Sequence, residues 1–140
     1  MKLRLTKHFE FQMAHALTGY DGKCQNIHGH NYKLLVTVEG TPIADSHSAK
    51  NGMVIDYGTL KSIVEEAVIS KVDHALVINE LSPFATITGT KMLTVPFQPT
   101  SENLLLWFAE LLGNQFPDNV HLHSLQLYET DSSCAELICD

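Results

Sequence analysis

The chain has 140 residues, of which 44% are hydrophobic and 18% charged, a balance that suits one folded domain over residues 1–140 and argues against disorder. Its formal net charge is −7, from 9 basic and 16 acidic residues, and it has no basic run, so nucleic acid is a poor candidate partner. No stretch reaches the ~18–20 apolar residues that a membrane span needs, and the first residues lack the apolar run of a signal peptide, so we expect no membrane partner and a cytoplasmic location.

Two stretches of alternating polarity open the chain. In residues 3–15 almost every second side chain is apolar, and the same alternation returns from His28 to residue 38, before Gly40 ends it. A period of two residues predicts half-buried β-strands. Glycine and polar residues at 19–22 predict a loop between the two strands, which could pair as a hairpin.

A helix and an irregular segment are expected next. Asp56 is a plausible helix N-cap, and the apolar residues that follow it at helical spacing predict a helix to about Lys71. Residues 80–98 are harder to assign. The threonines and β-branched residues from 84 to 95 favour a short hairpin.

The last third of the chain predicts a helix and two strands. Thr100 or Ser101 can cap a helix that ends at Gly113, and strands follow at about 120–129 and 134–139. The order strand, strand, helix, helix, strand, strand predicts an α+β fold, with a four-stranded antiparallel sheet and two helices on one face. Because such a sheet has two open edges, we expect an oligomer built edge to edge.

Three of the eight histidines are placed so that their side chains can meet. His15 ends the first predicted strand on its apolar face, and His28 and His30 lie on one face at the start of the second. Neighbouring strands are about 4.8 Å apart, so pairing would bring the three imidazoles to one point. Three nitrogen ligands with an open fourth position describe a catalytic zinc site. Each histidine alone could instead be a core residue, and a structural zinc would need a fourth ligand, for which Cys24 is near enough in sequence.

Other polar residues could take part in chemistry, and each has an ordinary alternative. Cys24 lies in a polar turn, where a neighbouring metal and lysine would favour the thiolate, a competent base or nucleophile; it could also be an unimportant loop thiol. Asp73 precedes His74 and could orient its ring, although such neighbours are common by chance. Glu129 closes a strand and is either solvated or able to accept two N–H groups of a purine or pterin ring.

Five segments form a recognisable set: residues 11–15, 24–32, 52–57, 73–76, and 99–103 with the later Glu129-Thr130. Together they resemble the 6-pyruvoyl-tetrahydropterin synthase superfamily over nearly the whole chain. The gap of three residues between Cys24 and His28 is similar to that of the bacterial 6-carboxy-5,6,7,8-tetrahydropterin synthases of queuosine biosynthesis. Eukaryotic pyruvoyl synthases have a longer gap.

The resemblance implies the tunnelling fold (T-fold), in which β-β-α-α-β-β subunits join edge to edge into a barrel. Two trimers then stack into a hexamer with active sites between subunits. It also implies a role for each matching residue: zinc on His15, His28 and His30; Cys24 as catalytic base, assisted by Asp73 and His74 from a neighbouring subunit; and Glu129 as pterin anchor, with Thr100 and Ser101 at the ring pocket.

The implied reaction converts 7,8-dihydroneopterin triphosphate to 6-carboxytetrahydropterin, acetaldehyde and triphosphate without a redox cofactor. Zinc would act as a Lewis acid on the side-chain oxygens of the substrate, and the thiolate would remove the acidified C–H proton. On the same site the product could be pyruvoyl-tetrahydropterin or 6-hydroxymethyldihydropterin, and a non-catalytic pterin- or metal-binding oligomer is a further alternative. Lys23, Lys33 and Lys91 are unranked candidates for binding the triphosphate.

Overall fold

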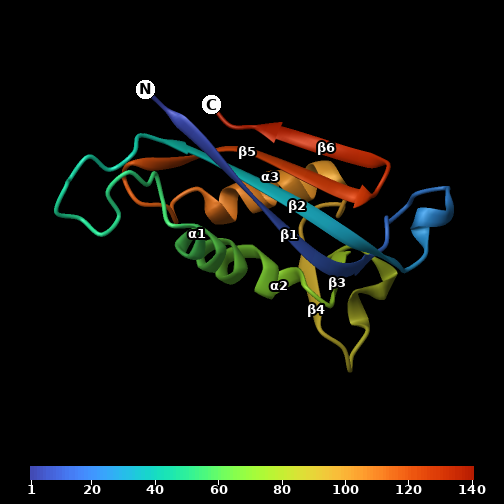
Figure 1. The fold of residues 1–140 in the computed structure, drawn as a ribbon. Helices are drawn as coiled ribbons and strands as arrows, with labels where there is room; N and C mark the ends of the chain where they lie inside the picture. Colours follow the sequence, from blue (N-terminus) through green and yellow to red (C-terminus); the bar gives the residue numbers. More distant parts are fainter.

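A six-stranded sheet runs through the centre of the molecule, and the helices pack on one of its faces (Figure 1). The computed structural model describes residues 1–140. The α+β fold with its helices on one face is therefore confirmed. In spatial order β4-β3-β1-β2-β5-β6, the strands are β1 (Leu3–His15), β2 (His28–Gly40), β3 (Ala75–Asn79), β4 (Met92–Val95), β5 (Val120–Thr130) and β6 (Ser133–Ile138).

The long β1–β2 hairpin confirms the two strands predicted from alternation. The strands pair antiparallel along their whole length, from Leu3 opposite Gly40 to His15 opposite His28. Their inward side chains join a core of 25 buried apolar residues, in which the rings of Phe11 and Tyr32 stack with centroids 5.0 Å apart. Burial of this apolar face is the main stabilising contribution to the hairpin, and it fixes which side chains at the strand ends point inward.

Strands β3 and β4 were not expected, and they correct the predicted sheet. Residues 84–95 do not form a hairpin: a 3₁₀ turn at Pro83–Thr86 leads to β4, which pairs parallel to β3. β3 in turn pairs parallel to the end of β1, next to Met13–His15. The sheet is therefore mixed, with six strands in place of four antiparallel ones.

A β-bulge in β5 decides which way its last residues point. His123 is an extra residue in the pairing of β5 with β2. Before it, the inward apolar residues are even-numbered, as at Leu122; after it they are odd-numbered, at Leu125 and Leu127. Because alternate residues share a face, Glu129 falls on the same inward face as the core.

The helices begin where the sequence predicts. α1 (Tyr57–Val64) starts after Asp56, whose carboxylate accepts a hydrogen bond of 2.7 Å from the amide of Gly58. It continues through a π-helical turn at Glu65–Ile69 into α2 (Ser70–Val72), just past the expected end. α3 (Ser101–Leu112) confirms the second predicted helix.

Thr100, rather than Ser101, is the N-cap of α3. Its hydroxyl accepts a hydrogen bond from the amide of Asn103 at 3.2 Å. We expect Thr100→Ala to lower the free energy of unfolding by about 1 kcal/mol, the usual cost of losing such a cap, and Thr100→Ser to restore most of it. Urea unfolding measures both variants. An unchanged free energy of unfolding in Thr100→Ala would contradict the assignment.

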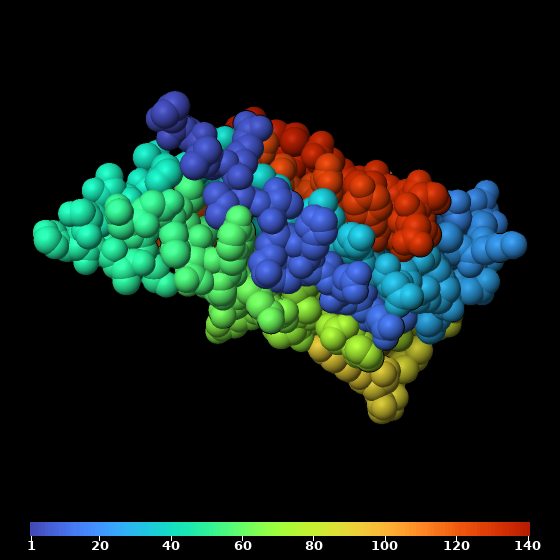
Figure 2. Space-filling view, in the orientation of Figure 1, coloured from blue at the N-terminus to red at the C-terminus, as the bar shows by residue number.

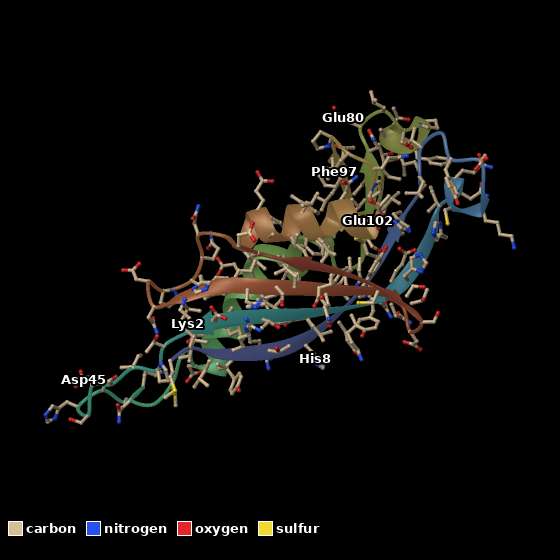
Figure 3. All side chains as sticks on the ribbon, turned by 90° about the horizontal axis from the view of Figure 1, so that it is seen from above. Lys2, His8, Asp45, Glu80, Phe97 and Glu102 are labelled. Atoms are coloured by element: carbon tan, nitrogen blue, oxygen red, sulfur yellow. The ribbon has the colours of Figure 1, made fainter.

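Two loops form the ends of the molecule (Figure 2). The segment 17–27 forms one end of the molecule and residues 41–52 the other. Asp45, in the second of these loops, and Glu80, after β3, lie at opposite ends in Figure 3. None of the helices combines the length and apolar character that a membrane crossing requires.

Candidate metal and catalytic site

The β1–β2 pairing brings His15, His28 and His30 together. His15 lies directly opposite His28, and His30 lies opposite Met13, two residues further along. The ring centroids of the three histidines are 4.6 to 5.2 Å apart. The Nε2 atoms of His15 and His28 are 3.1 Å apart. The expected convergence of the imidazoles is therefore what the structure shows.

Backbone carbonyls orient two of these rings. His15 Nδ1 lies 2.7 Å from the carbonyl oxygen of Pro99, and His28 Nδ1 lies 2.7 Å from that of Asn26. A carbonyl oxygen can only accept, so each Nδ1 carries the proton and, in a neutral ring, each Nε2 presents a lone pair. This outer hydrogen bond is the usual partner of a metal-bound histidine.

Burial favours the neutral forms of two of these imidazoles, His15 and His30. It lowers the pKa of His15, whose side chain is only 2% exposed, against the opposing effects of the Pro99 carbonyl and Glu129. Burial also lowers the pKa of His30, with Glu129 again acting in the opposite direction. Tyr32 lies beneath the cluster, and burial, followed by the nearby Glu129 and Cys24, raises the pKa of its hydroxyl. His15 and His30 are therefore favoured as uncharged nitrogen donors.

Glu129 joins this cluster from β5. Its Oε1 lies 3.0 Å from His30 Nε2 and 3.9 Å from His15 Nε2, while Ser101 donates a hydrogen bond of 2.9 Å to its Oε2. The contact with His30 is not aligned as a hydrogen bond, which leaves His30 Nε2 buried without a hydrogen-bonding partner. One atom from each of the three histidines and Glu129 lies within 4.8 Å of the others, so these four side chains could hold a metal ion.

Cys24 lies in the short 3₁₀ turn Lys23–Gln25, in the loop between β1 and β2. The amide of Leu17 donates to the carbonyl of Cys24 at 2.8 Å. Thr18 is held by Gln98, whose side-chain amide both accepts from its N–H at 2.9 Å and donates to its C=O at 2.6 Å. The thiol is half-buried and free. Gln98 was not among the residues predicted for the site, because side-chain hydrogen bonds to a backbone 80 residues away leave no signal in the sequence.

Asp73 and His74 lie apart from the histidine cluster in this chain. Asp73 Oδ1 accepts from the amide of Gln12 at 3.0 Å and lies 3.0 Å from His74 Nδ1, so the carboxylate does orient the ring. His74 has φ of 61°, a left-handed conformation that is uncommon outside glycine, and its side chain is 71% exposed. No hydrogen bond or ion pair links this pair to Cys24 or Glu129.

The exposed ring of His74 borders a hollow on the face of the sheet that carries no helices. The hollow has a volume of about 410 Å³, and its lining includes Gln12, Asn31 and His74. Lys91 supports this corner, because its ammonium donates to the carbonyls of Ser70 and Asp73 at 2.7 and 2.9 Å. Lys91 is thus engaged by backbone, whereas Lys23 and Lys33 form no ion pair in this chain.

The Asp73 carboxylate should contribute to stability above its unfolded pKa. The Gln12 amide, and then His74, hold the pKa of Asp73 below its usual 3.8. A depressed folded pKa gives stability that is present above pH 3.8 and lost as the pH falls through the folded value. We expect Asp73→Asn to be less stable than wild type at pH 7 and to converge with it in acid. Urea unfolding between pH 2.5 and 7 measures this, and an equal difference at every pH would contradict it.

Comparison with known proteins gives one consistent result. Residues 4–138 match the model of the family described as 6-pyruvoyl tetrahydropterin synthase. A Haemophilus influenzae protein named 6-carboxy-5,6,7,8-tetrahydropterin synthase is 37% identical over 140 residues, covering 95% of this chain and 96% of that relative. A 6-pyruvoyl tetrahydrobiopterin synthase of Pongo abelii is 33% identical over 114 residues, covering 80% and 68%. The structure of Caenorhabditis elegans 6-pyruvoyl tetrahydropterin synthase matches with a TM-score of 0.72 at 25% identity, covering 100% and 97%.

Proposed function

Because the chain belongs to the 6-pyruvoyl tetrahydropterin synthase family, we propose that it is a zinc-dependent lyase that converts 7,8-dihydroneopterin triphosphate to 6-carboxy-5,6,7,8-tetrahydropterin, acetaldehyde and triphosphate in queuosine biosynthesis. The observation that carries the proposal is the convergence of three imidazoles beside a carboxylate. The relative from Haemophilus influenzae, which is 37% identical and covers 95% of the chain, supports the carboxy product over the pyruvoyl one.

The donor set fits zinc. His15, His28 and His30 offer nitrogen atoms, two of them already oriented by carbonyl oxygens as metal-binding histidines usually are. The orphaned Nε2 of His30 is a buried lone pair or N–H that a ligand to the site would satisfy. A bound zinc ion would supply Lewis acidity toward the side-chain oxygens of the substrate.

Cys24 would act as the base in this reaction. Its loop, residues 16–27, joins His15 at the end of β1 to His28 at the start of β2, so the thiol and the imidazoles would approach the same substrate from adjacent backbone. Asp73 and His74 would shuttle the proton. Since they lie apart from Cys24 in one chain and His74 is exposed, we propose that a neighbouring subunit supplies them, as part of a hexamer built from two trimers.

Glu129, with Thr100 and Ser101, would recognise the pterin ring. A carboxylate can accept two parallel N–H bonds from the amidine edge of the ring. Ser101 already donates to one oxygen of Glu129, which sets the plane in which the other oxygen can turn. The cytoplasm, where thiols stay reduced, suits a chain whose three cysteines are all free.

Identification of the products decides between the candidate reactions. The purified, zinc-loaded protein would be incubated with dihydroneopterin triphosphate, and the pterin and small aldehydes would be identified by mass spectrometry. Stoichiometric acetaldehyde with 6-carboxytetrahydropterin is the expected result. A retained three-carbon side chain would make the protein a pyruvoyl synthase, and hydroxymethyldihydropterin would make it an aldolase. Binding without turnover would leave a pterin-binding oligomer.

A further inference from the structure

We propose that Glu129 is a fourth protein ligand of the metal in the substrate-free protein. On binding, the pterin ring displaces this carboxylate and frees one coordination position of the metal. The identity of the displacing molecule rests on the proposed function. The ligand assignment does not, because it follows from the geometry of four side chains. It concerns the resting protein, in which no ring yet competes for the carboxylate.

The separations of the donor atoms match a four-coordinate site. Two ligands bonded at 2.0–2.1 Å in a tetrahedron are about 3.3 Å apart. His15 Nε2 and His28 Nε2 are separated by 3.1 Å, and Glu129 Oε1 lies 3.0 Å from His30 Nε2. Glu129 Oε1 is also 3.9 Å from His15 Nε2. All four donor atoms lie within 4.8 Å of one another, so the carboxylate is placed to take the position that three imidazoles leave open.

Electrostatics within the cluster also calls for a cation. His15 and His28 each donate a hydrogen bond from Nδ1 to a carbonyl oxygen, so their Nε2 lone pairs face each other and the carboxylate. Lone pairs 3.1 Å apart repel unless a proton or metal ion lies between them. The Glu129 carboxylate is 27% exposed and is not aligned to accept a hydrogen bond from His30, so the same ion would also stabilise its charge.

Glu129 is placed for this role by two features of the fold. The bulge at His123 turns it to the inward face of β5, and Ser101 fixes its Oε2 at 2.9 Å. Oε1 is left to point at the histidines. Cys24, the other nearby candidate for a fourth ligand, is not part of this four-donor group.

Pairing of the same carboxylate with a pterin ring would couple recognition to activation. The ring offers two N–H groups to Glu129, and these compete with the metal for its oxygens. Once the carboxylate turns to the ring, one metal position becomes free for the side-chain oxygens of the bound substrate. In the absence of the ring that position stays closed to small anions and water.

Azide binding to the cobalt-substituted protein tests the ligand assignment. Wild type, Glu129→Gln and the control Glu110→Gln, which changes an exposed residue of α3, are loaded with one Co²⁺ and titrated with azide while the visible spectrum is recorded. Glu129→Gln is expected to bind azide at least about tenfold more tightly than the other two. Its zinc affinity, measured by chelator competition, should fall by at least about 10- to 100-fold, the loss that follows removal of even an outer hydrogen-bonding partner of a metal-bound histidine.

Wild type alone can overturn the assignment if the variant fails to fold. An azide response of wild type at low azide concentration would show an open position, and a cobalt–thiolate charge-transfer band would give that position to Cys24. Adding pterin, the ring without its hydroxylated side chain, to wild type should make azide binding appear; no change would refute displacement by the ring. The product assay fails or succeeds separately, because none of these measurements requires turnover.

Discussion

Replacing Cys24 with alanine is expected to lower kcat by about 10²- to 10⁴-fold while zinc content stays at the wild-type level. That range is what a positioned general base usually contributes. The thiol lies outside the four-donor group, so its removal leaves the metal ligands in place. A loss of turnover with full metal content would therefore isolate proton abstraction from metal binding.

The structure supplies a matched control for this experiment. Cys134 is an exposed, free thiol in β6, and Cys134→Ala should leave both turnover and zinc unchanged. Cys24→Ser keeps a side chain of similar size with a much weaker base, so it should resemble Cys24→Ala. Acetaldehyde formation by Cys24→Ala at the wild-type rate would remove Cys24 from the mechanism.

The strands that could be predicted from the sequence are those with one buried face and one solvent-exposed face. β1 and β2 alternate between buried and exposed residues, and this period of two is readable in sequence. β3 reads Ala-Leu-Val-Ile, with all four residues buried, and so carries no alternation. Short buried runs cannot be told from helix by pattern, and parallel pairing over three or four residues leaves no turn signal.

The candidate site shows the same division. His15, His28 and His30 could be placed together, because they belong to the ends of two alternating strands. Glu129 could not be placed on their face, because the bulge at His123 reverses which residues of β5 point inward, and the sequence carries no signal for this bulge. The carbonyls of Pro99 and Asn26 that orient the rings belong to the backbone and carry no residue signature.

His28→Ala is expected to reduce bound zinc from about one ion per chain toward none and to abolish turnover, while the chain stays folded. Loss of the His28 imidazole removes one of the four donors, and the remaining two imidazoles and Glu129 are arranged around a position that included His28, so the affinity for zinc should fall sharply. His28 suits the test better than His15, because it is half-buried at a strand end and lies outside the apolar core, whereas His15 is enclosed. Elemental analysis measures the metal, and circular dichroism with urea unfolding measures the fold.

His8 gives the control for this substitution, since it is exposed on β1 and lies on the side of the sheet away from α3 (Figure 3). His8→Ala should keep both zinc and turnover. A folded His28→Ala protein with full zinc would contradict the assignment, because the ion would then be bound without the His28 imidazole that lies 3.1 Å from His15 Nε2. A variant that loses zinc but also unfolds would show that the metal stabilises the hairpin. His30→Ala, two residues further along β2, would then separate metal binding from folding.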